Sequence, residues 1–411
     1  MGRGRERHPA DAQPATDPVL RGPAVRTAHG ALACLFGGLA VLAVVDPDVF
    51  REAMQEDALA EWASFWLFTF AGIAAIVAAV RAARSSDVSA GLWTTRAPLA
   101  AIGLFCLFVA GEEISWGQRF LGFRPPAYFL EANYQQELNL HNLLLEFVRT
   151  RLLVAAIAVG YGVLLPLAAG IWGRRSSRFH RWIRAGAPAA GLVPWFMIIA
   201  LVELAYPISF AGEAAELALG AVFAVDVWIR AARVMPIGPF AFPAGVAAGV
   251  LAILVFSRAT IVVSGVVAAS GDQALVARAE SDLDRLGDDL AIGSAIQPSL
   301  LLPGRVHQRV FTAVAKDHLR FSPDGAFLRN AGVAGDEPPS ARQNRHAYFL
   351  DPWHNSYWIF FSRNAGVILL YSMGPNRRRD TPVTSLTPAQ LRDAVMEDDD
   401  IGVAIELVPA K

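Results

Sequence analysis

Cysteine is scarce in this chain of 411 residues, which contains only two. Cys34 and Cys106 both lie inside apolar runs, where a cysteine packs as a small hydrophobic residue. A disulfide framework and a cysteine-based metal site are therefore not expected. Net charge is also small, at −1, so no overall charge attracts nucleic acid.

The sequence also lacks the motifs of common soluble enzymes. It contains no phosphate-binding loop, dinucleotide-binding glycine pattern, Gly-x-Ser-x-Gly elbow or His-Glu-x-x-His zinc motif. Residues 1–26 are rich in Arg, Pro, Asp and Ala without periodicity, which predicts a disordered basic cytoplasmic tail. Because this long polar lead precedes the first apolar run, we expect that run to stay as a membrane anchor and not to act as a cleaved signal peptide.

Long hydrophobic runs are what the sequence does have. Hydrophobic residues make up 54% of the chain, more than an ordinary soluble protein carries. A helix of about 17–25 apolar residues can cross a bilayer. The runs therefore predict a polytopic α-helical membrane domain over residues 27–263, with about seven spans. The expected spans are 28–45, 62–80, 98–113, 152–172, 188–206, 213–229 and 240–256.

Arginines in alternate connections predict the orientation of these spans. They occupy the tail and the connections after the second, fourth and sixth runs, whereas the connection after the first run is acidic. Because positively charged loops stay in the cytoplasm, we expect the chain to run N-in and C-out. The sixth run carries Glu213, Glu216 and Asp226, and we expect it to be buried among the other helices. The arginines outside the tail are Arg81, Arg84, Arg96, Arg174, Arg175, Arg178, Arg181, Arg184, Arg230 and Arg233.

The stretch 111–142 is the candidate site, because ionisable residues gather where the third span ends. Glu112 and Glu113 are adjacent there, and a charge at membrane depth needs a partner or a function. The two carboxylates could share a proton and act as general acid or base, with Arg119 neutralising one of them. The alternative is that they are interfacial charges beside an anchoring Trp116.

Glu137 and His141 form a second pair, four residues apart. If residues 133–147 are helical, the two side chains share a face and could bind a metal ion or hydrogen-bond to each other. A cavity lined by these groups, which Glu203 could join, would suit acid–base or metal-assisted chemistry on a lipid or lipid-linked substrate. A proton-coupled carrier and a receptor for a polar ligand remain open as well. The candidate catalytic residues are Glu112, Glu113, Arg119, Glu137 and His141.

The glutamate pair also resembles that of the CAAX-processing intramembrane proteases. Their pattern is Glu-Glu-x-x-x-Arg, followed by histidines on later helices. Here Gly117 occupies the arginine position, Arg119 is the nearest arginine, and His141 is the one well-placed histidine. The resemblance implies proteolysis within the membrane as a further alternative.

Residues 264–411 have the composition of a small folded domain outside the membrane. Leucine and alanine recur every three or four residues through 272–292, which predicts an amphipathic helix. We expect this helix to pack on a small antiparallel sheet, with a hairpin turn at 364–366. The expected strands are 309–315, 346–350, 357–361, 367–371 and 403–408.

Three motifs of this domain resemble the C-terminal part of the major pseudopilin of type II secretion systems. They are Leu350-Asp-Pro-Trp-His-Asn-Ser-Tyr357, Leu370-Tyr-Ser-Met-Gly-Pro-Asn376 and Glu397-Asp-Asp-Asp-Ile401, in the family's order. His354 stands where that family has Gly. The resemblance implies an α+β periplasmic domain on a bacterial inner-membrane protein, with a partner in secretion or envelope assembly. Because the sequence shows no pilin-type leader, we expect a reused fold and not a polymerising pilin.

The resemblance also implies a calcium site. In that family an acidic loop binds Ca²⁺, which corresponds here to Asp398, Asp399 and Asp400 with backbone carbonyls of residues 372–376. Clustered oxygens are the ligands that Ca²⁺ prefers. The alternative is a solvated acidic turn.

Overall fold

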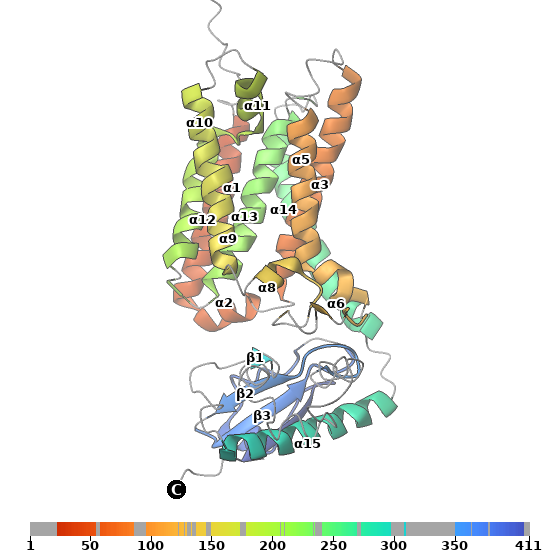
Figure 1. The fold of residues 1–411 in the computed structure, drawn as a ribbon. Helices are drawn as coiled ribbons and strands as arrows, with labels where there is room; N and C mark the ends of the chain where they lie inside the picture. Colours follow the sequence, from red (N-terminus) through yellow and green to blue (C-terminus); the bar gives the residue numbers. More distant parts are fainter. Residues whose placement is uncertain are drawn as a thin grey trace, which may run out of the picture. The chain divides into compact units, whose positions relative to one another are not determined.

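The computed structural model of the chain is mostly helical and contains a small antiparallel sheet near its C-terminus (Figure 1). The chain divides into two compact units, Met1–Ala110 with Arg151–Ser257, and Gly111–Thr150 with Arg258–Lys411. The structure describes residues 23–54, 58–85, 96–121, 123–126, 128–129, 133, 137–144, 149–172, 178–205, 207–208, 210–232, 234, 241–268, 273–296, 308–309, 350–362, 364–376 and 379–406.

Every apolar run that predicted a span forms a helix, within a few residues of the expected limits at most ends. Two short helices, α2 (Pro47–Ala53) and α11 (Arg178–Gly186), lie in the connections. The run 152–172 is helical throughout, with a π-helical segment, η5 (Gly160–Leu164), between α9 (Thr150–Val159) and α10 (Leu165–Trp172). The remaining long helices are α1 (Pro23–Val45), α3 (Leu59–Ser85), α5 (Ala97–Glu113), α12 (Val193–Ala205), α13 (Ala211–Ala232) and α14 (Ala241–Ala268).

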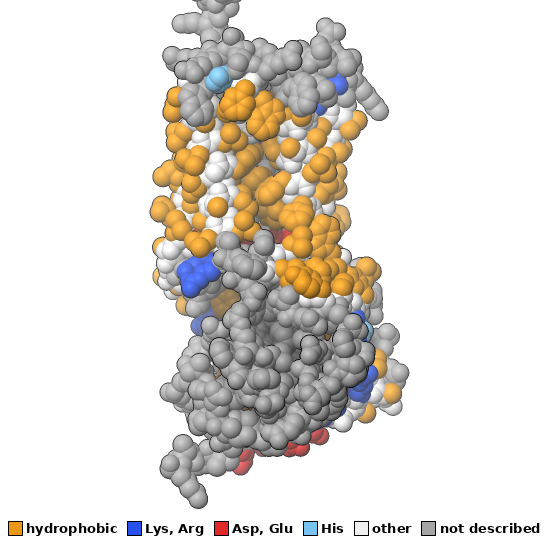
Figure 2. Space-filling view, viewed as in Figure 1, with side chains coloured by type: hydrophobic (Ala, Val, Ile, Leu, Met, Phe, Trp, Pro, Cys, Tyr) orange, Lys and Arg blue, Asp and Glu red, His pale blue; other side chains and the backbone are white. Residues whose placement is uncertain are grey.

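The helices of the first unit expose apolar side chains. Figure 2 shows hydrophobic side chains over the visible face of these helices. Among the described residues, Arg26–Val45, Leu59–Ala82 and Thr150–Ile171 are helical, apolar and long enough to cross a membrane, and Ala190–Ala205 and Ala248–Val263 are shorter apolar helices. A soluble protein does not leave so much contiguous apolar surface in water, so these helices are compatible with a membrane.

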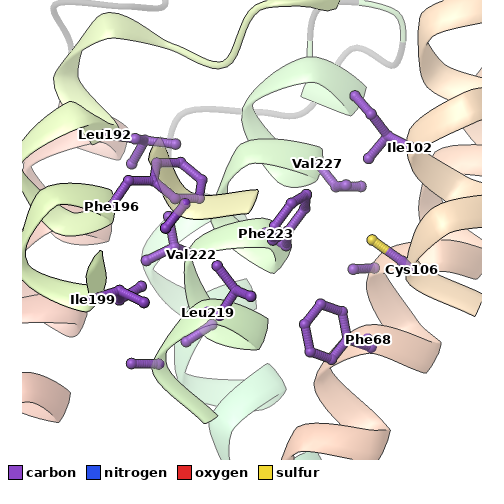
Figure 3. Packing of buried hydrophobic residues seen from close by; sticks show 14 of the residues in the cluster. Phe68, Ile102, Cys106, Leu192, Phe196, Ile199, Leu219, Val222, Phe223 and Val227 are labelled. Carbon is purple, nitrogen blue, oxygen red and sulfur yellow. The ribbon is translucent and has the colours of Figure 1, made fainter. Parts of the chain in front are cut away.

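Helix α13 forms much of the core of this unit. It is buried along most of its length, as expected for the sixth run. Phe223 of α13 contacts Phe68 of α3 and Phe196 of α12 within one apolar cluster (Figure 3). The cluster therefore joins helices that lie far apart in the sequence, from α1 to α13.

Arg230 was expected in the connection after the sixth run, but it lies within a helix. Helix α13 continues past it, and the residue is only 9% exposed. Its Nε donates to Asp226 Oδ2 at 2.8 Å, and the Tyr161 hydroxyl donates to the same oxygen at 2.6 Å. Its terminal nitrogens donate to the carbonyls of Ala185 and Gly186. The charge is neutralised inside the helical unit, where it fixes the connection between α11 and α12.

The second unit contains the sheet, with the order β1-β2-β3-β4 and every pair antiparallel. The expected turn at 364–366 joins β2 and β3, with Gly366 at a φ of 70°. Residues 310–315, 346–349 and 407–408 of the expected strands lie outside the described residues. The strands are β1 (Gln308–Arg309), β2 (Trp358–Ser362), β3 (Val367–Ser372) and β4 (Ile401–Glu406).

An amphipathic helix packs on this sheet, as the sequence predicts. Helix α15 (Gln273–Ile296) lies against β3 and β4. Its stripe of Ala279, Leu283 and Leu286 is almost fully buried. A separate cluster of the sheet, which includes Trp358 and Tyr371, packs against residues 383–396, where the short helix α19 (Pro388–Arg392) lies.

Candidate functional site

A left-handed turn ends helix α5 and shapes the candidate site. Ser115, Trp116 and Gly117 have φ angles of 47°, 54° and 86°. Consecutive left-handed residues are costly for L-amino acids and persist only where the surroundings hold them. Because α5 ends at Glu113 and Trp116 is left-handed, Arg119 does not lie on the same helix as the two glutamates. The side chain of Arg119 lies outside the described part of the chain.

Glu112 is buried and accepts hydrogen bonds from two directions. The indole Nε1 of Trp116 donates to its Oε1 at 2.6 Å. The backbone N–H groups of Leu140 and His141 donate to its Oε2 at 2.7 and 2.9 Å. These two amides begin the short helix α8 (Leu140–Leu144), so the carboxylate caps that helix from a distant segment.

Trp116 fixes the turn through its ring as well as its indole nitrogen. A Cβ atom added to Gly111 would lie 3.0 Å from two ring carbons of Trp116, so a side chain at that position would displace the ring. The ring remains 47% exposed. Glycine at 111 and tryptophan at 116 therefore depend on each other.

Glu137 belongs to a second, neighbouring network. Its Oε2 accepts the Ser115 hydroxyl at 2.7 Å and the Asn139 side-chain amide at 3.1 Å. Asn133 donates to the Glu137 carbonyl at 2.5 Å and to Asn139 Oδ1 at 2.9 Å. Gln118 accepts the backbone N–H of Leu138 at 2.7 Å. The side chains of this network are nearly inaccessible to solvent.

The shared helix face that would pair Glu137 with His141 does not form. Residues 137–139 are not helical, and α8 begins only at Leu140. Glu137 and His141 consequently do not share a helix face. Glu137 is bound by Ser115 and Asn139, whereas the His141 ring lies beside Glu112.

His141 and Glu112 form a pair suited to acid–base chemistry. Nδ1 of the imidazole lies 3.4 Å from Glu112 Oε2, and the imidazole side chain is 31% exposed. A buried carboxylate that faces Nδ1 favours the tautomer in which Nε2 can accept a proton. Both oxygens of Glu112 accept hydrogen bonds from N–H groups. Glu113, the other member of the expected proton-sharing pair, is half-buried.

Sequence reasoning located this stretch but missed several of its partners. Ser115, Gln118 and Asn133 are buried parts of the network that were not singled out. The available signal was small: three polar side chains within a segment that already holds two glutamates next to an apolar run. Among the described residues, no three His, Cys, Asp or Glu side chains lie together as a metal site of such ligands requires.

The acidic loop before β4 places its three aspartates differently. Asp398 is exposed, with a φ of 50°. Asp399 Oδ2 accepts the N–H of Asn376 at 2.8 Å, and Asp400 Oδ2 accepts the N–H of Thr381 at 2.7 Å. The Oδ1 atoms of Asp399 and Asp400 are buried without a hydrogen-bond partner. Burial raises the pKa of both carboxyl groups, that of Asp400 to about 7.

The other two motifs shape the loops around this segment. Asp351 is buried, and it accepts the N–H groups of Trp353 and Asn355 and the hydroxyl of Ser372. Gly374 has a φ of 62°, and a Cβ there would lie 2.0 Å from the backbone oxygen of Asp399. Glycine is therefore required for the two loops to approach each other.

Two acids of the fifth and sixth runs are buried within the first unit. Asp226 is bound by Arg230 and Tyr161 in the first unit, and Glu203 is buried there as well. Comparison of the chain with protein-family models, with curated proteins and with solved structures finds no match.

Proposed function

We propose that this chain is a multi-pass inner-membrane protein of a bacterium that displays its C-terminal α+β domain on the outer side of the membrane. The domain would bind a protein partner in secretion or envelope assembly. The observation that carries the proposal is the combination of apolar helices with a sheet that has its own packed core. Such a sheet can keep its fold outside the bilayer while the helices anchor it.

Two details support the resemblance to the pseudopilin domain. His354 stands where that family has Gly, and its φ of 69° is one that glycine adopts without strain. Asp351, the first residue of the Asp-Pro-Trp motif, joins its loop to β3 through Ser372. The Asp-Pro-Trp motif and the motif that contains Ser372 thus stabilise the fold of the domain. A displayed domain needs such a stable fold.

Removing the domain tests this function. A bacterial strain that lacks the chain would be complemented with the full chain, with residues 1–270, or with the full chain carrying His141→Ala. We expect the shortened chain to insert normally but to fail in restoring secretion or the envelope barrier, whereas His141→Ala restores both. Full restoration by residues 1–270 would overturn the display function. Cysteine labelling from the outer side, at position 140 and in the sheet, would test the orientation.

We also propose that the acidic loop holds Ca²⁺. The buried Oδ1 atoms of Asp399 and Asp400 lack hydrogen-bond partners, and a cation would satisfy both. Backbone carbonyls of residues 372–376 would supply further oxygen ligands. Calorimetric titration of the full chain should show Ca²⁺ binding that Asp399→Asn and Asp400→Asn weaken. Equal heats from the wild type and both variants would contradict this site.

The Glu112–His141 pair supports a second candidate function, acid–base chemistry on a lipid or lipid-linked substrate. The observation that favours it is the buried carboxylate beside a partly exposed imidazole. Arg119 and Glu113 would then bind or neutralise the substrate's charged group. Mass spectrometry of total lipids should reveal a species that changes with expression of the wild type but not of His141→Ala. Identical lipid profiles would count against this chemistry.

A further inference from the structure

Glu203 lies on the inward-facing side of helix α12. Phe196, Ile199 and Ala200 precede it on the same buried stripe, at helical spacing. Figure 3 shows Phe196 and Ile199 among the core residues that α12 contributes alongside α13. Leu201 and Leu204 are 61% and 57% exposed on the opposite side of the helix. The position of Glu203 in the stripe therefore keeps its carboxyl group away from the lipid-facing surface.

The carboxyl group has no partner in the part of the chain that the structure describes. Glu203 is 1% exposed, and neither side-chain oxygen has a hydrogen-bond partner. Asp226 is the other buried acid among the described residues of the first unit, and it accepts several hydrogen bonds. An ionised carboxylate without donors in an apolar environment costs far more than a protonated one.

Among the residues that the structure describes, Arg151 is the cation that acts on a negative charge at Glu203. Helix α12 packs against α13 and against the helix that begins with α9. Arg151, in the first turn of α9, acts on Glu203 electrostatically without a hydrogen bond to it. In α13, the acids of the first turns are Glu213 and Glu216, both half-buried. On α1, which meets α12 through Phe36 and Trp195, the described titratable groups are Arg26, His29 and Cys34.

We propose that Glu203 is a proton-binding site of the apolar unit, with the proton on its carboxyl group at neutral pH. The proton replaces the hydrogen-bond donors that the surrounding side chains do not supply. Arg151 provides the means of release, because a closer approach of its guanidinium would stabilise the ionised form. Display of the C-terminal domain does not require such a site, so this activity belongs to the membrane unit itself.

Labelling with dicyclohexylcarbodiimide tests the proposal, because apolar carbodiimides react with protonated carboxyl groups within membranes. The full chain in native membranes would be labelled over a range of pH, and the modified peptide identified by mass spectrometry. We expect the label on Glu203, increasing as the pH is lowered through neutrality. Glu203→Gln should abolish it, whereas Glu213→Gln and Glu216→Gln should not. Arg151→Met should strengthen the labelling, because it removes the charge that favours ionisation.

Three results would overturn the proposal. Glu203 could stay unlabelled at every pH while other glutamates react, which would mean that it is ionised. Sodium ions could suppress the label at constant pH, which would make the site a cation site. Glu203→Gln mimics the protonated form, and it could shorten the half-life of the folded protein at a fixed temperature severalfold. That result would mean that the folded unit needs the negative charge. An unchanged or longer half-life supports the proton-bound form.

Discussion

The Glu112 carboxylate accepts hydrogen bonds from a tryptophan four residues away and from the start of a helix 28 residues further along the chain. Replacing it with glutamine removes the charge and one of the two acceptor oxygens. Because hydrogen bonds to a buried charge contribute about 1.5–3 kcal/mol each, Glu112→Gln should lower the free energy of unfolding by about 2–4 kcal/mol. Thermal unfolding in detergent, followed by tryptophan fluorescence, would measure it.

Glu113→Gln is the matched control for this prediction. It changes the same chemical group at the adjacent, half-buried position, and it should cost less than about 1 kcal/mol. Equal losses of stability in the two variants would show that Glu112 has no special role in holding the left-handed turn to α8.

Asp226 and Arg230 are a buried ion pair within one helix. Asp226→Asn leaves the guanidinium buried without its counter-charge, which typically costs about 3–5 kcal/mol. The double replacement Asp226→Leu with Arg230→Met removes both charges and should recover much of that loss. If the single variant unfolds like the wild type, the pair does not neutralise the arginine as the geometry indicates.

The sequence identified these acids but not their partners, for a physical reason. A glutamate beside an apolar run is costly, so its importance is visible in the sequence alone. Its donors come from segments that only the fold brings together, as Leu140 does for Glu112. Arg230 was assigned to a connection because it lies at the end of an apolar run, where arginines usually mark a cytoplasmic loop. The sequence alone does not distinguish such a loop residue from the buried partner of Asp226.

Helices α3 and α5 approach each other through paired glycines. A Cβ at Gly72 would lie 2.7 Å from Leu107 Cγ, and one at Gly103 would lie 2.8 Å from Ile76 Cδ1. Small residues of this kind allow helix backbones to pack closely in apolar surroundings. Gly103→Val should therefore destabilise the first unit by about 1–3 kcal/mol through overpacking. Heat denaturation in detergent would again report the loss.

Gly38→Ala is the control for Gly103→Val. No atom lies within 4 Å of a Cβ added at Gly38, which is in the middle of α1. The substitution should be neutral or stabilise the helix by about 0.5–1 kcal/mol. A loss at position 38 as large as at position 103 would mean that glycine is needed for reasons other than close packing.

The elements themselves were predicted far better than their connections. Apolar runs and the stripe of α15 carry a periodic signal that survives in the fold, and the turn at 364–366 contains the glycine its geometry needs. Helix α19 was missed, although its capping box is visible in the sequence as Thr387-Pro-Ala-Gln390. No helix runs through residues 137–139, because Glu137 and Asn139 form hydrogen bonds with buried side chains of the network instead.

The two compact units of the chain differ in where their apolar side chains lie. The first exposes apolar side chains, as a lipid environment allows, while the second buries a separate apolar core around a sheet. Composition predicts a change of character after residue 263, where the hydrophobic runs end, whereas the second unit also includes residues 111–150. The course of residues 111–150 was less predictable, since a left-handed turn and a network of amides leave no periodic pattern.

Asp400 makes the stability of the second unit depend on pH. Burial raises the pKa of Asp400 to about 7, from a usual value of 3.8. A carboxyl group whose pKa is raised by folding stabilises the folded state at low pH and loses that contribution as the pH rises through the folded-state value. In buffer with a chelator, the temperature at which the second unit unfolds should therefore decrease as the pH is raised from about 4 to about 7. Asp400→Asn should flatten this dependence.

Calcium should reverse the sign of that dependence. Metal binding requires ionised carboxylates, so Ca²⁺ competes with the proton at Asp399 and Asp400 and binds more tightly as the pH rises. With saturating Ca²⁺, the unfolding temperature should be higher than in chelator, and the difference should grow through neutral pH. Mg²⁺, which demands a smaller octahedral site, should have little effect. Identical curves in calcium and chelator would contradict the metal site.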